Sequence, residues 1–418
     1  MHVWYRRIYP ILLLTLIGTL IILLLYILNV YIAGLGGKYE TSDFMVLWLS
    51  GKGLVVGTDL YNPQAWQMLH TTFAPYYSDN PIFIFPLPTA FLFVPFSFLP
   101  PRWGGALWLF INEGLTILFF AWVIGKTPYK KKLLMILFIA LIAATFQPVI
   151  ITVLSGQYNL IMLIIVAAVF ILFSGEKDWT AGVVTAFLSL RPNPVVFFVP
   201  GLLIFAISRK RWKYLAGFVA AVAGLFLLSE LIRPGWIGVW LDYTIGGHGK
   251  LYTYGEIAPT LRGLLNDIGS RLSPLVRNGI NLIVTLLLSI YGIVLSLRKN
   301  VSQGYVFSIL ITISLCITPY AWNYDQVLLL FPLAYMILSQ QTRTARARRV
   351  TWLFVFMIFS VLPYLLRYIA IQRGTDTLSL LVPFAILILL VISDNIRGSN
   401  SRLNETPDHP AVNMNMNP

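Results

Sequence analysis

Residues 10–32 read PILLLTLIGTLIILLLYILNVYI, an almost unbroken run of Leu, Ile, Val and Tyr. About 20 apolar residues in a helix cross a hydrocarbon core of about 30 Å, so this stretch is long enough to span a bilayer. It is too long for the apolar core of a signal peptide and no small-residue cleavage site follows it, which favours a retained first helix. Across all 418 residues, 58% are hydrophobic and 11% are charged, against about 25% charged in soluble domains. The sequence predicts an all-α polytopic membrane protein.

The net charge of +14 indicates how the chain is oriented in the membrane, and it does not indicate a nucleic-acid partner. The basic residues stand in short clusters between apolar stretches, as expected for cytoplasmic loops that follow the positive-inside rule. No soluble segment combines basic and aromatic residues in the way that a nucleic-acid-binding surface does. The single cysteine, Cys316, excludes an intramolecular disulfide and fits a small core residue. The clusters are Arg6-Arg7, Lys126 with Lys130 to Lys132, Arg209 to Lys213, Arg298-Lys299, and Arg343 to Arg349.

Placing every basic cluster in the cytoplasm predicts about twelve transmembrane helices, with both termini inside. Residues 1–398 then form one membrane domain with two long outer loops, about 33–103 and 233–278, and the polar residues 399–418 form a disordered cytoplasmic tail. Long ordered loops in a compact protein usually carry function. The expected spans are 10–32, 104–124, 133–154, 158–174, 179–190, 192–208, 214–232, 279–298, 304–321, 325–342, 350–369 and 378–395.

Two segments interrupt this pattern. Residues 81–101 are apolar but hold six prolines, and proline inside a helix costs about 3 kcal/mol, so a broken, interfacial or re-entrant outer segment is expected. The sequence Arg191-Pro192-Asn193-Pro194 separates two short apolar segments, which predicts a hairpin with its apex in or near the outer leaflet. No internal repeat is visible, so an inverted-repeat transporter gains no support.

The first outer loop contains two helix starts. Ser42 is placed to cap a helix with Asp43 in its first turn, which Gly57 ends, and Asn62-Pro63 begins a second helix. The apolar residues repeat at helical spacing, which predicts amphipathic helices lying on the membrane. In the first helix these residues are Phe44, Leu47, Trp48, Gly51, Leu54 and Val55, and in the second they are Trp66, Leu69 and Phe73.

Asp43 has two interpretations. A carboxylate in the first turn of a helix stabilises it by about 0.3–1 kcal/mol at exposed sites. Alternatively, an acid beside the lipid headgroups is placed to act as a general base on an acceptor hydroxyl, an effect typically worth about 10²–10⁴ in rate. Spacing alone does not separate the two.

If the acceptor hydroxyl attacked a sugar carried on a phosphate, the site would also need groups that bind the leaving phosphate. Outer-side candidates are Arg191, Arg262, His248 and Tyr324. Arg191 is the strongest, because a permanent charge at a broken hairpin is costly unless paired and a planar guanidinium suits phosphate. The alternatives are snorkelling of Arg191 to the interface and plain solvation of Arg262 and His248 in a loop.

Two further polar sites lie within or beside apolar spans. Asn112-Glu113 falls near the middle of one span, where it is either a structural hydrogen-bonding pair, which we favour, or part of the cavity. Asp325 begins another span, where it either caps the helix or faces the active cavity. Aromatic residues such as Trp322 belong at that depth in any membrane protein.

Seven short motifs, in order over about residues 10–340, resemble the GT-C superfamily of membrane glycosyltransferases, specifically glycosyltransferase family 87. Each motif is weak alone, and the ordered set is fairly specific. Besides the proline-rich run 81–101 they are Ser42-Asp43-Phe44, Gly57-Thr58-Asp59-Leu60-Tyr61-Asn62, Ser155-Gly156-Gln157-Tyr158-Asn159, Leu190-Arg191-Pro192-Asn193-Pro194, Leu261-Arg262-Gly263-Leu264, and Thr318-Pro319-Tyr320-Ala321-Trp322-Asn323-Tyr324.

The resemblance implies a GT-C fold with juxtamembrane helices in the first outer loop and an acidic base at Asp43. It also implies an inverting transfer from a polyprenyl-phosphate sugar. The chain departs from the family in having Arg191 where Lys is frequent and Tyr324 where His is frequent, and a tyrosine supplies no positive charge. Candidate cavity-lining residues at or beside the matching motifs are Asp59, Tyr61, Gln157, Asn159, Trp322, Asn323 and Asp325.

The hypothesis is an inner-membrane hexosyltransferase with its active site on the outer face. It would move a hexose, with mannose favoured, from a polyprenyl-phosphate donor to a lipid or glycan acceptor. No cofactor is expected; no convincing cluster of metal ligands is visible, and a metal requirement stays open. The rival interpretations are a transporter or flippase for lipid-linked sugars, and a non-catalytic scaffold. The sugar, acceptor, linkage and oligomeric state stay open.

Overall fold

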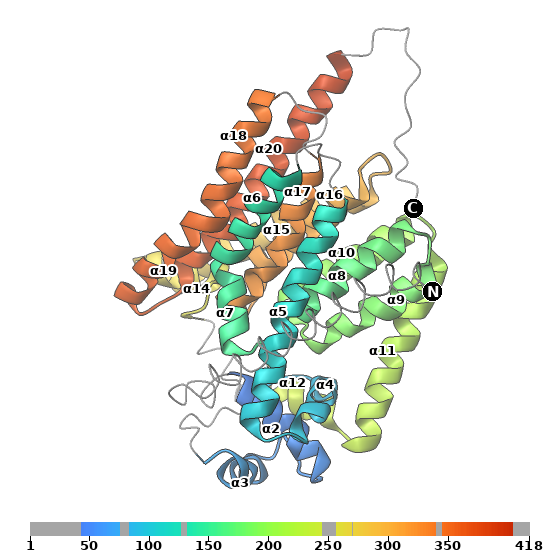
Figure 1. The fold of residues 1–418 in the computed structure, drawn as a ribbon, viewed down its shortest axis with the longest axis vertical. Helices are drawn as coiled ribbons and strands as arrows, with labels where there is room; N and C mark the ends of the chain where they lie inside the picture. Colours follow the sequence, from blue (N-terminus) through green and yellow to red (C-terminus); the bar gives the residue numbers. More distant parts are fainter. Residues whose placement is uncertain are drawn as a thin grey trace, which may run out of the picture. The chain divides into compact units, whose positions relative to one another are not determined.

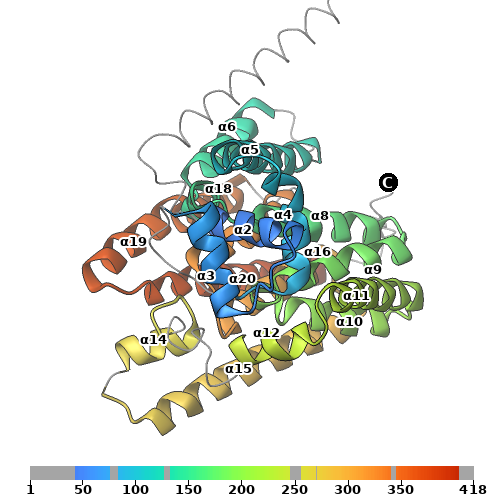
Figure 2. The same cartoon turned by 90° about the horizontal axis from the view of Figure 1, so that it is seen from below.

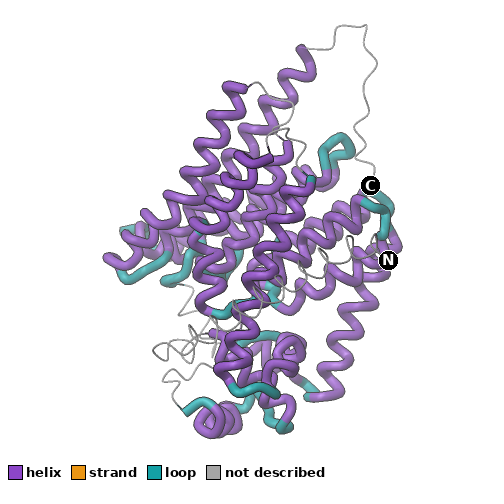
Figure 3. The backbone as a smooth tube through the Cα atoms, in the orientation of Figure 1, coloured by secondary structure: helices purple, strands orange, loops and turns teal. Residues whose placement is uncertain are grey.

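The computed structural model describes residues 43–75, 83–126, 132–244, 256–269, 271–339 and 345–403. These residues form helices and connecting loops and contain no strand, so the all-α prediction is confirmed (Figure 3). The predicted first helix 10–32, the Ser42 cap and His248 lie outside the described residues. The last helix continues to Leu403, past the predicted start of the tail at residue 399.

The chain divides into two compact units, which we describe separately. The first comprises residues 1–117 and 152–158, and the second comprises residues 118–151 and 159–418. In the first unit α2 packs against both α3 and α4 (Figure 2). Its helices are α2 (Asp43–Val55), α3 (Pro63–Phe73), α4 (Leu87–Ser97) and the first part of α5 (Pro101–Gly125).

The second unit is a larger helical assembly (Figure 1). Its core is α16, in which every residue from Tyr305 to Cys316 is buried. Cys316 is a free, buried thiol, as expected for a core residue. Its elements are α6 (Lys132–Thr145), α7 (Gln147–Ser155, which ends in the first unit), α8 (Asn159–Ser174), α9 (Asp178–Ala186), η2 (Phe187–Leu190), η3 (Asn193–Val195), α10 (Phe198–Ser208), α11 (Trp212–Ile232), α12 (Trp236–Thr244), α14 (Leu261–Ile268), α15 (Pro274–Leu297), α16 (Gln303–Ile317), η4 (Asn323–Leu329), α17 (Leu330–Ser339), α18 (Ala345–Phe356), η6 (Met357–Val361), α19 (Leu362–Arg373), η7 (Thr377–Leu380) and α20 (Leu381–Leu403).

The predicted count of twelve spans is not confirmed. Among the described residues, four helices are long and apolar enough to cross a membrane: α5, α11, α15 and the continuous stretch Val350–Arg373. A fifth is obtained if Ile136–Thr145 and Gln147–Ser155 count as one span, and these two helices meet at a bend of 56°. Residues 81–101 are broken as predicted, because the short α4 ends before α5 begins at Pro101.

The prediction that α2 is an amphipathic surface helix is wrong. Every residue from Phe44 to Gly51 is buried, and eight consecutive residues cover all faces of a helix with 3.6 residues per turn. The reason is α4, which packs so closely that a Cβ at Gly51 would lie 2.5 Å from the Phe93 carbonyl carbon. The Trp48 indole N–H also donates to the Phe96 carbonyl at 3.0 Å. A helix enclosed in this way cannot be read from one-sided apolar spacing.

The other local signals of the first loop are confirmed. Gly57 takes a φ of 74° just after α2, a conformation that favours glycine. The Asn62 side chain accepts a hydrogen bond from the Ala65 N–H at 2.9 Å, with Pro63 as the first residue of α3. Trp66 and Leu69 of the predicted apolar stripe are buried, whereas Phe73 is half-buried.

Helices α9 and α11 approach each other through glycines. A Cβ on Gly182 would collide with the Tyr214 carbonyl oxygen, and a Cβ on Gly217 would collide with the Trp179 carbonyl oxygen. Small residues at such crossings let helix backbones approach closely. Replacement of either glycine forces the two helices apart.

We therefore expect Gly217→Ala to lower the free energy of unfolding by about 1–3 kcal/mol, the usual cost of overpacking. Gly224→Ala is the matched control on α11, because a Cβ there meets nothing within 4 Å, and alanine favours a helix by about 1 kcal/mol over glycine. Thermal unfolding of the purified variants measures both. Equal melting temperatures for the two variants would contradict the close approach.

Candidate active site

The break between η2 and η3 positions Arg191. Pro192 and Pro194 prevent a regular helix here, since proline lacks the backbone N–H and restricts the residue before it. Arg191 itself leaves helical geometry, with φ −140° and ψ 79°. The apex is tied to the end of α16, because the Thr318 hydroxyl donates to the Asn193 carbonyl at 2.8 Å. The predicted hairpin break is confirmed.

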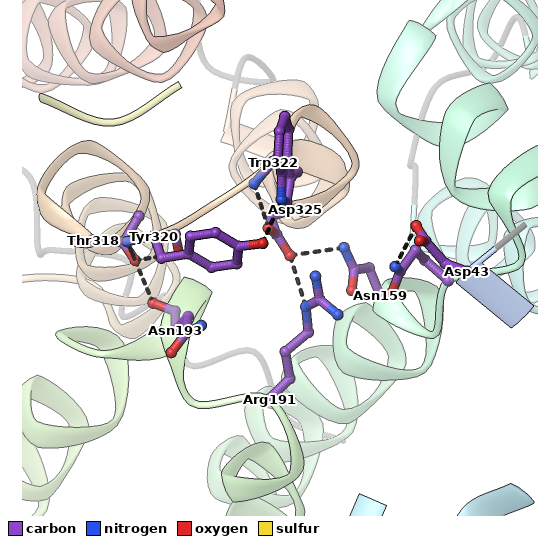
Figure 4. Close-up of polar contacts among 9 residues, drawn as sticks. Asp43, Asn159, Arg191, Asn193, Thr318, Tyr320, Trp322 and Asp325 are labelled. Atoms are coloured by element: carbon purple, nitrogen blue, oxygen red, sulfur yellow. Dashed lines mark hydrogen bonds and ion pairs between the residues drawn. The ribbon is translucent and has the colours of Figure 1, made fainter. Parts of the chain in front are cut away.

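Arg191 forms a buried ion pair with Asp325, drawn in Figure 4. Its Nε lies 2.8 Å from Asp325 Oδ1, and the two side chains are only 7% and 1% exposed. The guanidinium also lies over the Tyr324 ring, 5.1 Å from its centroid. The snorkelling interpretation of Arg191 is therefore wrong: a carboxylate and an aromatic face hold this charge inside the second unit.

Asp325 accepts three hydrogen bonds that fix its position. Besides Arg191, the Asn159 side-chain N–H donates to Oδ1 at 2.9 Å and the Trp322 backbone N–H donates to Oδ2 at 2.7 Å. The two sequence-based alternatives are not exclusive, since the carboxylate both caps η4 and faces a cation. Asp325 thus serves as the common acceptor that orients Arg191 and Asn159.

Amide side chains surround this ion pair. Asn323 Nδ2 donates to Gln147 Oε1 at 3.1 Å. The side-chain oxygens of Asn159 and Asn323 are buried, and neither has a hydrogen-bond partner within the part of the chain that the structure describes. Such oxygens accept hydrogen bonds from hydroxyl groups, which makes them suited to a polyhydroxylated ligand.

Asp43 lies in the first unit and contacts Gln157. Gln157 Nε2 donates to Asp43 Oδ2 at 2.7 Å, and the Gln157 side chain is almost fully buried. Gly156 precedes it with a φ of 70°, and the Gly156 carbonyl accepts the Trp108 indole N–H at 2.7 Å. A glycine turn and a tryptophan therefore position the amide that orients the Asp43 carboxylate.

The remaining predicted site residues have mixed placements. Asp59 accepts the Tyr61 backbone N–H at 3.0 Å, and the Tyr61 hydroxyl donates to the Phe85 carbonyl at 2.8 Å. These contacts stabilise the loop, and a cavity-lining role for either residue stays a prediction. Arg262 lies half-buried on α14, and its role in phosphate binding likewise stays a prediction.

Two residues that were not among the predicted site residues belong to the same region of the second unit. The Tyr320 hydroxyl accepts the Trp322 indole N–H at 2.6 Å, and Gln147 holds Asn323. Gln147 did have a signal, since a glutamine followed by proline interrupts an otherwise apolar predicted span. The prediction for Asn112 is wrong, because its buried side chain has no hydrogen-bond partner among the described residues.

Helix α14 is fastened to the turn after α19. Leu261 and Leu264 pack against Leu380, and Asp267 accepts hydrogen bonds from Arg373 at 2.6 Å and from the Thr377 hydroxyl at 2.6 Å. Part of the second predicted outer loop is therefore an ordered, docked element.

The turn after α19 contains a buried acid of its own: Asp376 is 7% exposed and accepts the Ser379 hydroxyl at 2.7 Å. Burial raises its pKa, while the Ser379 hydrogen bond and the Arg367 charge act in the opposite direction. Because the folded state holds the proton more tightly, the wild type loses stability as pH rises from about 3.8 through the raised pKa.

We expect Asp376→Asn to remove this dependence, because the amide oxygen still accepts the Ser379 hydroxyl but no buried charge forms. The difference in melting temperature between the variant and the wild type should grow in the variant's favour as pH rises. Thermal unfolding over a pH series measures it. Parallel curves for the two proteins would contradict the raised pKa.

No group of three or more His, Cys, Asp or Glu residues that could hold a metal ion occurs in the described ranges. The candidate site residues carry carboxylate, guanidinium, amide and aromatic hydroxyl groups. Together with apolar helices long enough to cross a bilayer, this defines a helical membrane protein with a buried polar site at a helix break.

A comparison with protein families shows which reaction this class of membrane protein carries out. Residues 83–319, more than half of the chain, match the sequence model of glycosyltransferase family 87. The chain belongs to this family, and it is a glycosyltransferase. No curated protein and no solved structure matches the chain.

The family assignment confirms the resemblance seen in the sequence and is consistent with the GT-C superfamily. The matched range includes Gln157, Asn159, Arg191 and Arg262. Asp43 precedes it and Asp325 follows it. The roles of these two acids therefore rest on their own contacts.

Proposed function

We propose that this glycosyltransferase transfers a hexose, with mannose favoured, from a polyprenyl-phosphate donor to a hydroxyl of a lipid or glycan acceptor. The observation that carries the proposal is the buried Arg191–Asp325 pair at a helix break in an apolar protein. A buried arginine held by a carboxylate provides a fixed charge for an anionic group, and guanidinium geometry suits phosphate. A lipid-borne phosphate would reach such a site from within the bilayer.

The reaction is a single displacement with inversion at the anomeric carbon. The acceptor oxygen forms the new glycosidic bond as the bond from the anomeric carbon to the phosphate oxygen breaks. Asp43 takes the acceptor's proton, and polyprenyl phosphate leaves with the electron pair. Gln157 orients the Asp43 carboxylate through the 2.7 Å hydrogen bond.

Arg191 binds the phosphate and Asp325 keeps the guanidinium in place, with Tyr324 stacked against it. Arg262 and His248 are further candidates for the phosphate. The side-chain oxygens of Asn159 and Asn323 accept hydrogen bonds from sugar hydroxyls. Gln157 and Asn159 belong to one sequence motif, Ser155-Gly156-Gln157-Tyr158-Asn159, which ties base orientation and sugar binding to the same few residues.

The proposed location is the cell membrane, with the active site on the outer face and both termini in the cytoplasm. The basic clusters between the apolar segments support this orientation. The family assignment favours the enzyme over the transporter or flippase interpretation, because a transferase makes a new covalent bond.

The direct test uses the purified full chain in lipid nanodiscs with a host lipid extract as acceptor. Radiolabelled polyprenyl-phosphate-mannose, polyprenyl-phosphate-glucose and a nucleotide-linked mannose are offered separately. We expect label to appear on a new lipid or glycan only with a polyprenyl-phosphate donor. Transfer from the nucleotide sugar alone would overturn the donor class, and movement of donor across the bilayer without a covalent product would favour the transporter.

A further inference from the structure

A polar cavity lies within the second unit, lined by none of the residues of the Arg191–Asp325 ion pair. It has a volume of about 380 Å³ and is lined by Phe173, Phe205, Arg209, Arg211, Val301 and Gln303. Binding pockets for small molecules begin at about 300 Å³, so the cavity is large enough for a small polar headgroup. Two of its six lining residues are arginines, and no lining residue is acidic.

The tight turn between α10 and α11 places both arginines at the cavity. Lys210 takes a φ of 57° and is itself exposed, while its neighbours Arg209 and Arg211 line the wall. Arg209 donates to the carbonyls of Arg298 and Lys299 at 2.7 and 2.8 Å, and its guanidinium lies over the Phe205 ring. Arg209 Nε is buried and has no hydrogen-bond partner among the described residues.

Arg211 is only partly neutralised. Its NH1 group donates to Asp178 Oδ1 and to the Phe173 carbonyl. Burial lowers the pKa of Arg209, and the nearby charge of Arg211 lowers it further. The two cations therefore repel each other at one cavity, an arrangement that an anion between them relieves.

The surrounding turns are strongly basic as well. Helices α8, α10 and α15 end here and α9, α11 and α16 begin here, and α9 packs against both α8 and α11 (Figure 1). Trp179 and Trp212, both more than half exposed, lie in the first turns of α9 and α11, as aromatic residues do at membrane interfaces. The charged residues of the three turns are Lys177, Arg209, Lys210, Arg211, Lys213, Arg298 and Lys299 against Glu176 and Asp178.

We propose that this cavity is a binding site for a phosphate group at the membrane surface opposite the proposed catalytic face, with Arg209 and Arg211 as its ligands. The ends of candidate spans α11 and α15 place the cavity where phospholipid headgroups lie. Basic pockets between membrane helices on the cytoplasmic side bind anionic headgroups. The cavity suits a headgroup better than an acyl chain, because its wall combines guanidinium groups with the Gln303 amide. The proposal does not depend on the sugar-transfer assignment.

The test measures binding of phosphatidylglycerol to the detergent-purified full chain by native mass spectrometry, with phosphatidylcholine as the uncharged reference. We expect Arg209→Gln to weaken phosphatidylglycerol binding by about tenfold or more, the loss that one charge-assisted hydrogen bond corresponds to. Lys213→Gln is the matched control, because it removes one positive charge from the same turn at an exposed residue that does not line the cavity. We expect its affinity to equal the wild-type value.

Inorganic phosphate distinguishes the two sources of the ligand. Competition by inorganic phosphate would show that the phosphate group alone suffices, whereas binding of the lipid without competition would assign the site to a headgroup. If Arg209→Gln does not fold, Arg209→Lys keeps the charge with fewer fixed donors and is expected to weaken binding severalfold. Wild-type affinity in both Arg209 variants, or an equal loss in Lys213→Gln, would overturn the proposal.

Discussion

Asp43→Asn should abolish most sugar transfer, lowering the rate by about 10²–10⁴-fold, the usual contribution of a positioned general base. The substitution is nearly isosteric, and its amide oxygen still accepts the Gln157 N–H that now reaches Oδ2 at 2.7 Å. The fold should therefore persist while the proton acceptor is lost. The measurement is the initial rate of label transfer from polyprenyl-phosphate-mannose, alongside the melting temperature of each protein.

The matched control is Asp242→Asn. This acid is exposed on α12, in the second predicted outer loop, and its replacement makes the same change in net charge. Its transfer rate should stay at the wild-type level. Equal activity of wild type and Asp43→Asn would leave only the helix-stabilising interpretation of Asp43.

The second large effect concerns the buried ion pair. Arg191→Met leaves Asp325 as a carboxylate that is 1% exposed and has lost its cation. Removing one partner of a buried pair costs about 3–5 kcal/mol, because the other charge remains buried. We expect a correspondingly large fall in melting temperature and complete loss of transfer.

The double variant Arg191→Met with Asp325→Asn separates structure from function. No unpaired buried charge remains, and the amide oxygen of the new side chain can still accept a hydrogen bond from Asn159 or Trp322, so most of the lost melting temperature should return. Sugar transfer should stay absent, because the proposed phosphate ligand is missing. Recovery of both stability and transfer would show that the pair is structural only.

The sequence was sufficient for features that depend on nearby residues. The α3 cap at Asn62, the turn at Gly57 and the break around Arg191 all follow from the local chemistry of Asn, Gly and Pro, and all are confirmed. The same holds for the all-helical fold, because the length and apolar composition of each segment can be read directly from consecutive residues.

Features that depend on packing between distant segments were not predictable. The enclosure of α2 depends on α4, and the partner of Arg191 lies 134 residues further along the chain. Periodicity gives the faces of a helix but not what covers them, so α2 was predicted to lie on a surface. Sequence order suggested Arg191 and Asp325 as separate candidates, and only the three-dimensional structure brings them into one ion pair.

That long separation affects how the protein is made. During synthesis at about 5–20 residues per second, Asp325 emerges about 7–27 s after Arg191, since the two residues are 134 positions apart. For that time the nascent chain carries an arginine between two apolar segments without its final counter-ion. Because an unpaired charge in hydrocarbon is costly, we expect the segment around Arg191 to stay near water or lipid phosphate until the start of η4 arrives. Chains interrupted before residue 325 should be recognised as unassembled and degraded.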